Sequence, residues 1–157
     1  MLRPRTDGWL PDTLGRVHMV GIGGSGMSGI ARVLAESGHQ VTGTDRAASE
    51  VTESLEHAGI RVFIGEDSGF VDEADTVIST YAVRDHHPEM VRARQRDIAV
   101  LHRADALRRI CRGRRVMAVG GSHGKTTSTA ILATAIETLG EDIQAVNGGV
   151  VSAWGVS

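Results

Sequence analysis

The sequence predicts an α/β protein: a Rossmann-like, doubly wound parallel sheet with helices on both faces, followed by the first strand and helix of a P-loop domain. Two observations lead to this fold class. Short apolar runs alternate with segments of helical spacing up to about residue 111, and this alternation favours a parallel sheet with right-handed crossovers. In addition, glycine-rich turns follow two of the predicted strands, each just before a helical segment.

The first part of the chain carries three predicted strands and two helices. Short apolar runs predict strands over 17–22, 41–44 and 61–64, and helical spacing predicts helices over 25–37 and 49–58. Gly38 and Gly59 follow the two helical segments, where glycine commonly ends a helix, and Ser49 is a suitable N-cap.

The alternation continues to residue 111. We expect strands over 76–80, after an acidic turn at 72–75, and over 98–101. Pro88 suits the first turn of a helix that runs to about residue 96, and a short helix is expected over 104–111. Glycine and arginine then concentrate at 112–115, which predicts a first domain over 1–112 and the beginning of a second domain over 113–157. That second piece is too small to bury its own core, so we expect the chain to be a fragment.

Composition excludes several classes of protein. The chain has 157 residues, a net charge of −2 and a pI near 6.4, which gives no electrostatic reason to expect nucleic acid or an anionic membrane as partner. Its single cysteine excludes an internal disulfide. No apolar stretch is long enough to cross a bilayer and no signal peptide precedes the first strand, so we expect a cytoplasmic protein.

Lys125 is the only lysine of the chain, against sixteen arginines. It follows an apolar run over 116–119, predicted to be a strand, and the glycine-rich turn 120–124, and it precedes a segment of helical spacing. Lysine reaches β- and γ-phosphates as a compact charge, whereas the planar fork of arginine is bulky. This order predicts a phosphate-binding loop, although Val119 stands where the standard spacing has its first glycine. A chance Gly-Lys-Thr sequence is the alternative.

A different glycine pattern follows the first predicted strand. Gly21, Gly23 and Gly26 have the spacing of a dinucleotide-binding loop, and Asp45 ends the second strand 19 residues after Gly26. An acidic residue there accepts hydrogen bonds from ribose hydroxyls. The pattern predicts a nucleotide site without deciding between NAD and another nucleoside diphosphate, and tight turning alone is the structural alternative. A ligase that joins a nucleotide-linked substrate to a second compound at the expense of ATP needs both loops.

Five segments of the chain carry a family resemblance. They are 21–31, 43–45, 88–89, 121–127 and 147–149. On these motifs the chain resembles the Mur ligase family, and within it the members that add L-alanine to UDP-N-acetylmuramate. Murein peptide ligases share the second loop but not the Gly-Gly-Ser-Gly-Met-Ser form of the first, so they rank second. A stand-alone NAD-type Rossmann protein is the further alternative.

The resemblance implies a three-domain, ATP-dependent and ADP-forming ligase of peptidoglycan precursor synthesis, with ATP and Mg²⁺ as cofactors and UDP-N-acetylmuramate and L-alanine as substrates. This chain would supply the UDP-sugar domain and the start of the central P-loop ATPase domain, without turnover of its own. The implied UDP-sugar contacts are Gly23, Gly24, Ser25, Gly26, Met27, Ser28, Asp45 and Thr80. The implied ATP contacts are Gly121, Ser122, His123, Gly124, Lys125, Thr126 and Thr127, with Lys125 catalytic and Thr126 a magnesium ligand.

The chain departs from the family pattern at a few positions. Thr44 stands where the family usually has serine, and Ser122 stands where it usually has threonine. Both differences are mild. Tyr81 stands in a loop where the family has small hydroxyl residues, His87 replaces an asparagine, and Glu66 replaces a common histidine.

The apolar face predicted for the last helix is a separate expectation. It comprises Ile131, Leu132, Ala135 and Leu139. We expect this face to pack on the first domain or on a neighbouring chain, as in a homodimer.

Overall fold

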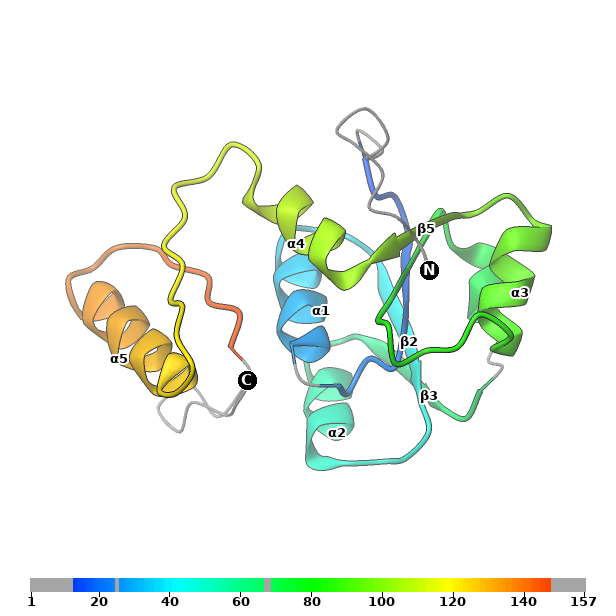
Figure 1. Ribbon diagram of the computed structural model, residues 1–157, viewed down its shortest axis with the longest axis horizontal. Helices are drawn as coiled ribbons and strands as arrows, with labels where there is room; N and C mark the ends of the chain where they lie inside the picture. Colours follow the sequence, from blue (N-terminus) through cyan, green and yellow to red (C-terminus); the bar gives the residue numbers. More distant parts are fainter. Residues whose placement is uncertain (1–12, 25, 67–68, 148–157) are drawn as a thin grey trace.

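The computed structural model describes residues 13–24, 26–66 and 69–147. It confirms the predicted fold class, because five parallel strands form one sheet in the order β3-β2-β1-β4-β5 (Figure 1). The strands are β1 (Val17–Val20), β2 (Val41–Asp45), β3 (Arg61–Ile64), β4 (Thr76–Ser79) and β5 (Ala99–His102). The helices are α1 (Met27–Glu36), α2 (Glu50–His57), α3 (Pro88–Gln95), α4 (Arg103–Cys111) and α5 (Lys125–Thr138), and a 3₁₀ turn, η1 (Phe70–Glu73), precedes β4.

Helices cover both faces of the sheet (Figure 1). On one face, α1, α2 and α4 pack on the sheet around Met19, Ile30, Leu55 and Ala106, which are buried. On the other face, a smaller cluster joins α3 and η1 to the sheet through Val20, Val71, Val77, Met90 and Ala93. Because both faces are covered, the central strands β1 and β4 are buried at every residue, as in parallel sheets generally.

The local helix signals are confirmed. Ser49 is the N-cap of α2, and it forms a reciprocal pair of hydrogen bonds with Thr52: the N–H of Thr52 donates to Ser49 Oγ (3.2 Å) and the N–H of Ser49 donates to Thr52 Oγ1 (2.8 Å). Gly38 and Gly59 follow the ends of α1 and α2 with φ of +87° and +81°, which is the left-handed region that favours glycine. The other bounds differ from the predicted ones by one or two residues.

The strand predicted over 116–119 is not formed. These residues have no regular secondary structure, and Val116 and Met117 are 55% and 63% exposed. A strand needs a neighbour for its backbone N–H and C=O groups, and none of the strands in the described part of the chain pairs with this run. The apolar composition was therefore insufficient to predict a strand here.

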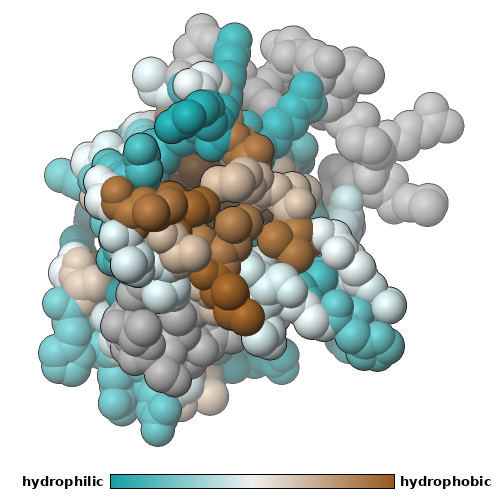
Figure 2. Space-filling model, turned by 90° about the vertical axis from the view of Figure 1, so that its left-hand side faces the viewer, coloured by the Kyte–Doolittle hydropathy of each residue, from teal (hydrophilic) through white to brown (hydrophobic). Residues whose placement is uncertain are grey.

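Helix α5 is formed as predicted, but its expected packing on the first domain is wrong. Ile131, Leu132 and Leu139 are 66%, 36% and 80% exposed, and Ala133 is the buried residue of the helix. Figure 1 shows α5 standing apart from the sheet and the helices that cover it, and Figure 2 shows apolar side chains gathered on that side of the molecule. Packing on a second copy of the chain stays a prediction.

The segment after α5 returns to the sheet domain. Gln144 Nε2 donates a 3.0 Å hydrogen bond to Glu36 Oε2 at the end of α1. Arg114, in the connection before α5, donates to Gln144 Oε1 and, at 3.3 Å, to Ser37 Oγ. Val146 packs on the core around α1. The end of α1 thus anchors both the segment that leads to α5 and the segment that leaves it.

A buried polar network joins the sheet to α3. The carboxylate of Glu89, in the first turn of α3, is fully buried and accepts a 2.6 Å hydrogen bond from Thr44 Oγ1 in β2. It also lies 3.2 Å from Nε2 of His18 in β1, an ion-pair distance without hydrogen-bond alignment. The other ring nitrogen of His18 is 2.9 Å from Thr42 Oγ1. A buried carboxylate is tolerated only with such partners, so this network fixes α3 on the β1–β2 pair.

We expect the Glu89→Ala variant to lower the free energy of unfolding by about 3–5 kcal/mol, because it removes one partner of a buried polar cluster. Urea denaturation followed by circular dichroism measures the change. Glu56→Ala removes an exposed glutamate from α2 and is the matched control, which should stay within about 0.5 kcal/mol of the unsubstituted chain. Equal stability of the two variants would contradict a role for the network in holding α3.

Candidate functional site

The loops at the carboxyl ends of four strands meet at one edge of the sheet. The chain reverses its direction of winding between β1 and β4, because β2 and β3 lie on one side of β1 and β4 and β5 on the other. Ligands of open α/β sheets bind at such a switch point. The glycine loop 21–26 follows β1, Asp45 ends β2, Thr80 follows β4 and His102 ends β5. The structure therefore brings together the predicted contacts of the first domain that it describes.

The end of β2 holds the glycine loop in place. The N–H groups of Gly21 and Ile22 both donate to the C=O of Thr44, at 2.8 and 2.9 Å. The N–H of Gly23 donates to Asp45 Oδ2 at 2.9 Å. Asp45, which the sequence predicts to contact a nucleotide, therefore uses one carboxylate oxygen to position the loop.

The loop then turns sharply into α1. The N–H of Gly24 donates to the C=O of Gly21 (3.1 Å), and those of Met27 and Ser28 donate to the C=O of Gly24 (2.8 and 3.3 Å). Gly26 is the N-cap of α1, with a left-handed φ of +75°. The N–H groups of residues 24, 27 and 28, three of the UDP-sugar contacts that the family resemblance implies, already bond within the loop. A ligand would share these N–H groups with the loop carbonyls.

Two glycines of this loop lie close to neighbouring side chains. A Cβ at Gly23 would lie 3.0 Å from Asp45 Oδ2 and from Thr52 Cγ2, and a Cβ at Gly26 would lie 3.0 Å from Arg103 Nη1. Arg103, the first residue of α4, thus places its guanidinium against the loop. Sequence reasoning assigned Arg103 no role at this site, although its position directly after a strand that ends at this edge is a usable signal.

The predicted contact Thr80 shapes the loop after β4. Its Oγ1 accepts a 3.2 Å hydrogen bond from the N–H of Ala82, and its C=O accepts one of 3.1 Å from the N–H of Val83. This turn leaves Tyr81 77% exposed. Ser25, the remaining predicted contact of the first domain, lies outside the described residues.

In the second glycine loop, the side chain of the lysine folds back onto the loop carbonyls. Lys125 Nζ donates to the C=O groups of Gly121 (2.5 Å) and Ser122 (3.1 Å). Gly124 is the N-cap of α5, with φ of +76°. All seven predicted ATP contacts, residues 121–127, lie on this exposed turn and the first turn of α5. A cation held over a loop at a helix N-terminus suits a bound anion.

A small cavity lies beside the first loop. It has a volume of about 250 Å³, and Gly26 of the first loop, Arg103 and Asn147 are among the residues that line it. Asn147 Nδ2 also donates a 3.2 Å hydrogen bond to the C=O of Thr126, in the first turn of α5. Asn147 belongs to the family motif at 147–149, but sequence reasoning assigned it no contact. Gly148 and Gly149 of that motif lie outside the described residues.

His102 combines two roles at the end of β5. Its Nδ1 accepts a 3.1 Å hydrogen bond from the N–H of Ala104 and so caps α4, and its ring lies against the ring of Tyr81, with 3.8 Å between centroids and 32° between planes. Burial lowers the pKa of His102 below its ordinary 6.5, against the nearby charge of Asp105 and with a smaller contribution from Arg103. The cap requires the neutral imidazole, because only an unprotonated Nδ1 accepts a hydrogen bond.

The lowered pKa of His102 predicts a pH dependence of stability. Since the unfolded chain binds this proton more tightly than the folded one, the stabilisation is present above about pH 6.5 and is lost as the pH falls through the folded pKa. We expect the melting temperature to fall less between pH 7.5 and 5.5 in His102→Asn, since asparagine caps helices without titrating. Thermal denaturation at both pH values measures this, and identical pH profiles would contradict the assignment.

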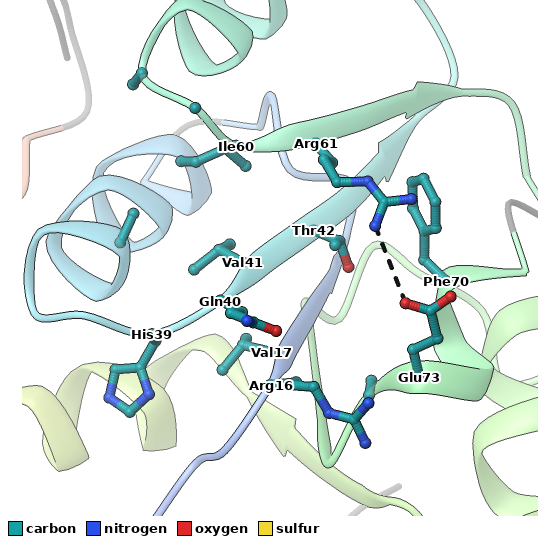
Figure 3. A pocket seen from close by; sticks show the side chains of 14 residues that line it. Arg16, Val17, His39, Gln40, Val41, Thr42, Ile60, Arg61, Phe70 and Glu73 are labelled. Carbon is teal, nitrogen blue, oxygen red and sulfur yellow. Dashed lines mark ion pairs between the residues drawn. The ribbon is translucent and has the colours of Figure 1, made fainter.

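A second cavity lies at the opposite edge of the sheet, among the starts of β1, β2 and β3 (Figure 3). Its volume is about 440 Å³. The arginines that line it have partners: Arg61 lies 4.0 Å from Glu73 and over the ring of Phe70, and Arg16 binds Asp75 at 3.2 Å. This cavity therefore offers no excess charge to a ligand.

Within the described part of the chain, no group of three or more histidine, cysteine, aspartate or glutamate side chains is placed to hold a metal ion. None of the helices within 13–24, 26–66 and 69–147 combines the length and the apolar composition needed to cross a membrane.

Comparison with known proteins gives one family. The model of the Mur ligase family, catalytic domain, matches residues 16–115. A UDP-N-acetylmuramate–L-alanine ligase of Clavibacter michiganensis is 45% identical over 157 residues, which is 100% of this chain and 33% of that protein. One of Rhizobium johnstonii is 43% identical over 148 residues, or 94% of this chain and 31% of that protein. The chain thus spans about a third of the length of these relatives.

Solved structures agree with the fold. A UDP-N-acetylmuramate–alanine ligase of Thermotoga maritima superposes with a TM-score of 0.83 at 34% identity, covering 88% of this chain and 33% of that one. A UDP-N-acetylmuramate:L-alanyl-γ-D-glutamyl-meso-diaminopimelate ligase of Neisseria superposes with a TM-score of 0.81 at 29% identity, covering 92% of this chain and 46% of that one.

Proposed function

This chain belongs to the Mur ligase family, and we propose that it forms the UDP-sugar-binding domain and the beginning of the ATP-binding domain of a UDP-N-acetylmuramate–L-alanine ligase. The observation that carries the proposal is the pair of different nucleotide-type loops in one chain. Gly26 of the first loop lines a small cavity together with Asn147, and Asn147 donates a hydrogen bond to the C=O of Thr126 in the second loop. Identity of 45% along the full chain to a ligase of this name supports the choice within the family.

In this proposal the first loop binds the UDP-sugar. The diphosphate lies over the turn 23–28 at the N-terminus of α1, where backbone N–H groups and the helix dipole favour an anion. The guanidinium of Arg103, which reaches Gly26, adds a positive charge. Asp45 lies on the uridine side and Thr80 lines the site from β4. The domain bounds are 1–112 for this unit and 113–157 for the start of the ATP-binding unit.

The second loop binds the phosphates of ATP. Lys125 exchanges its contacts with the carbonyls of Gly121 and Ser122 for the β- and γ-phosphates, while the N–H groups of 121–126 surround them. The Thr126 hydroxyl fits a place in the coordination shell of Mg²⁺, an ion that takes few protein ligands and completes its shell with phosphates and water. The ion supplies charge neutralisation of the phosphates when bound.

The chemistry follows from the low reactivity of a carboxylate toward an amine at neutral pH. An oxygen of the lactyl carboxylate attacks the γ-phosphorus of ATP, the bond to ADP breaks, and an acyl phosphate forms. The amine of L-alanine then attacks the acyl carbon, loses a proton, and phosphate leaves from the tetrahedral intermediate. Positioning and charge neutralisation by Lys125 and the two loops carry most of the rate enhancement in such a transfer.

The remaining features of the proposal concern the whole protein. The ligase acts in peptidoglycan precursor synthesis in the cytoplasm, and the 157-residue chain binds substrate without turning it over. The exposed face of α5, with Ile131 and Leu139, is covered either by further chain or in a homodimer.

Calorimetric titration of the chain with UDP-N-acetylmuramate tests the proposal, with NAD as comparator. We expect saturable binding of the UDP-sugar and none of NAD. Gly26→Val should weaken binding strongly, because the residue has a left-handed φ of +75°, which a β-branched side chain disfavours, and because its Cβ would lie 3.0 Å from the Arg103 guanidinium. Gly113→Val, at a glycine of positive φ with open space around it, controls for backbone strain away from the site. Saturable NAD binding without UDP-sugar binding would favour the stand-alone Rossmann alternative.

The alternative within the family is a murein peptide ligase, since one such ligase superposes almost as well as the L-alanine ligase. The ligase that carries this chain, assayed for ADP release, distinguishes the two by its amino substrate. Free L-alanine supports release in the proposed enzyme, and L-alanine-initiated peptides support it in the alternative.

Lys125 should be essential in that ligase. We expect Lys125→Ala to lower kcat/KM for ATP by about 10²–10³-fold, the usual cost of losing a group that stabilises charge in the transition state. Arg115→Ala removes a 99% exposed cation before the loop and should change kcat/KM less than about twofold. A similar, small effect of both substitutions would contradict the phosphate-binding role.

A further inference from the structure

The loop after β4 presents an aromatic ring at the nucleotide-binding edge. Tyr81 is the only tyrosine of the chain and is 77% exposed. One side of its ring lies against the imidazole of His102, at 3.8 Å between centroids and 32° between planes. Because so much of the side chain is exposed, the ring still offers a broad apolar surface for contact with a ligand.

A two-residue segment of the chain connects this ring to the first glycine loop. Ser79 is paired with His102 in the register of β4 and β5, so Tyr81 lies just beyond the paired ends of these strands. Arg103, the neighbour of His102 in the chain, reaches Gly26. Residues 102 and 103 therefore connect the two loops: Arg103 approaches Gly26, and the ring of His102 lies against Tyr81.

The position of Tyr81 decides which part of a ligand it meets. β2 and β4 flank β1 on opposite sides, so Asp45 and Tyr81 lie on opposite sides of the glycine loop. A nucleoside diphosphate sugar with its diphosphate on the loop and its ribose toward Asp45 extends its sugar to the side of β4 and β5. A ligand held in this way would bring its hexopyranose, and not its base, to the side of Tyr81.

Resting on the proposed function, we propose that Tyr81, supported by His102, forms an aromatic subsite for the hexopyranose ring of the UDP-sugar. The C–H groups on one face of a pyranose are apolar and slightly positive, and the face of an aromatic ring is apolar and slightly negative. His102 is itself fixed by the N–H of Ala104. A ring stacked on a fixed neighbour loses little conformational entropy when a ligand binds. The subsite favours the UDP-sugar over UDP alone.

Calorimetry on the 157-residue chain tests the subsite with UDP and UDP-N-acetylmuramate as probes. We expect Tyr81→Ala to weaken binding of the UDP-sugar by about three- to tenfold, the usual worth of an aromatic contact, and to leave the Kd of UDP unchanged. Tyr81→Phe keeps the ring and should keep both affinities. Equal weakening for UDP and the UDP-sugar would overturn the subsite, and so would no change for either. Wild-type chain that binds neither probe would overturn the proposed function and the subsite with it.

Saturation-transfer NMR gives a readout that a purely structural role of Tyr81 would not produce. In the otherwise deuterated chain with protonated tyrosine, the ring protons of Tyr81 are the only aromatic tyrosine signals. Saturating them should transfer magnetisation to the pyranose protons of the bound UDP-sugar and not to the uracil protons. Transfer to uracil alone would overturn the assignment to the sugar.

Discussion

The hydrogen bond from Thr44 to the buried carboxylate of Glu89 is the contact on which the functional edge of this fold depends. The Thr44 side chain faces α3, while its carbonyl accepts the N–H groups of Gly21 and Ile22. One residue thus joins the helix layer on one side of the sheet to the glycine loop at its edge. Because Asp45 adds the bond to Gly23, the loop is positioned by two adjacent residues of β2 whose own position is fixed from α3.

Those features of the fold that are encoded locally could be predicted from the sequence. Ser49 as a cap and Gly38 and Gly59 as helix ends act within a few residues, and the alternating apolar runs gave the parallel sheet. The prediction of a strand over 116–119 was wrong. A strand depends on a neighbouring strand, and an apolar run does not indicate whether such a neighbour is present. The network of His18 and Glu89 joins residues far apart in the sequence, and nothing in either segment indicates that they meet.

The candidate site also has some features that the sequence predicts and others that depend on tertiary packing. The glycine spacings and the single lysine identified two loops, and Asn147 connects them, because it lines the cavity beside Gly26 and bonds to the C=O of Thr126. It could not be foreseen that the loop N–H groups bond to loop carbonyls, that Arg103 lies against Gly26, or that Asn147 touches the first turn of α5. Each depends on how helices pack after the strands end. Tyr81 was noticed as a departure from the family pattern, but its stacking on His102 required the register of β4 and β5.

The isolation of α5 has a consequence for how the chain unfolds. Burial of apolar surface is what joins segments into one cooperative transition, and α5 contributes little of it, with Ala133 as its buried residue. The amides of α5 should therefore exchange with solvent through local openings while those of the sheet stay protected. A denaturation midpoint of this chain then reports the unfolding of the sheet and its covering helices. Helix α5 unfolds earlier, in a separate transition.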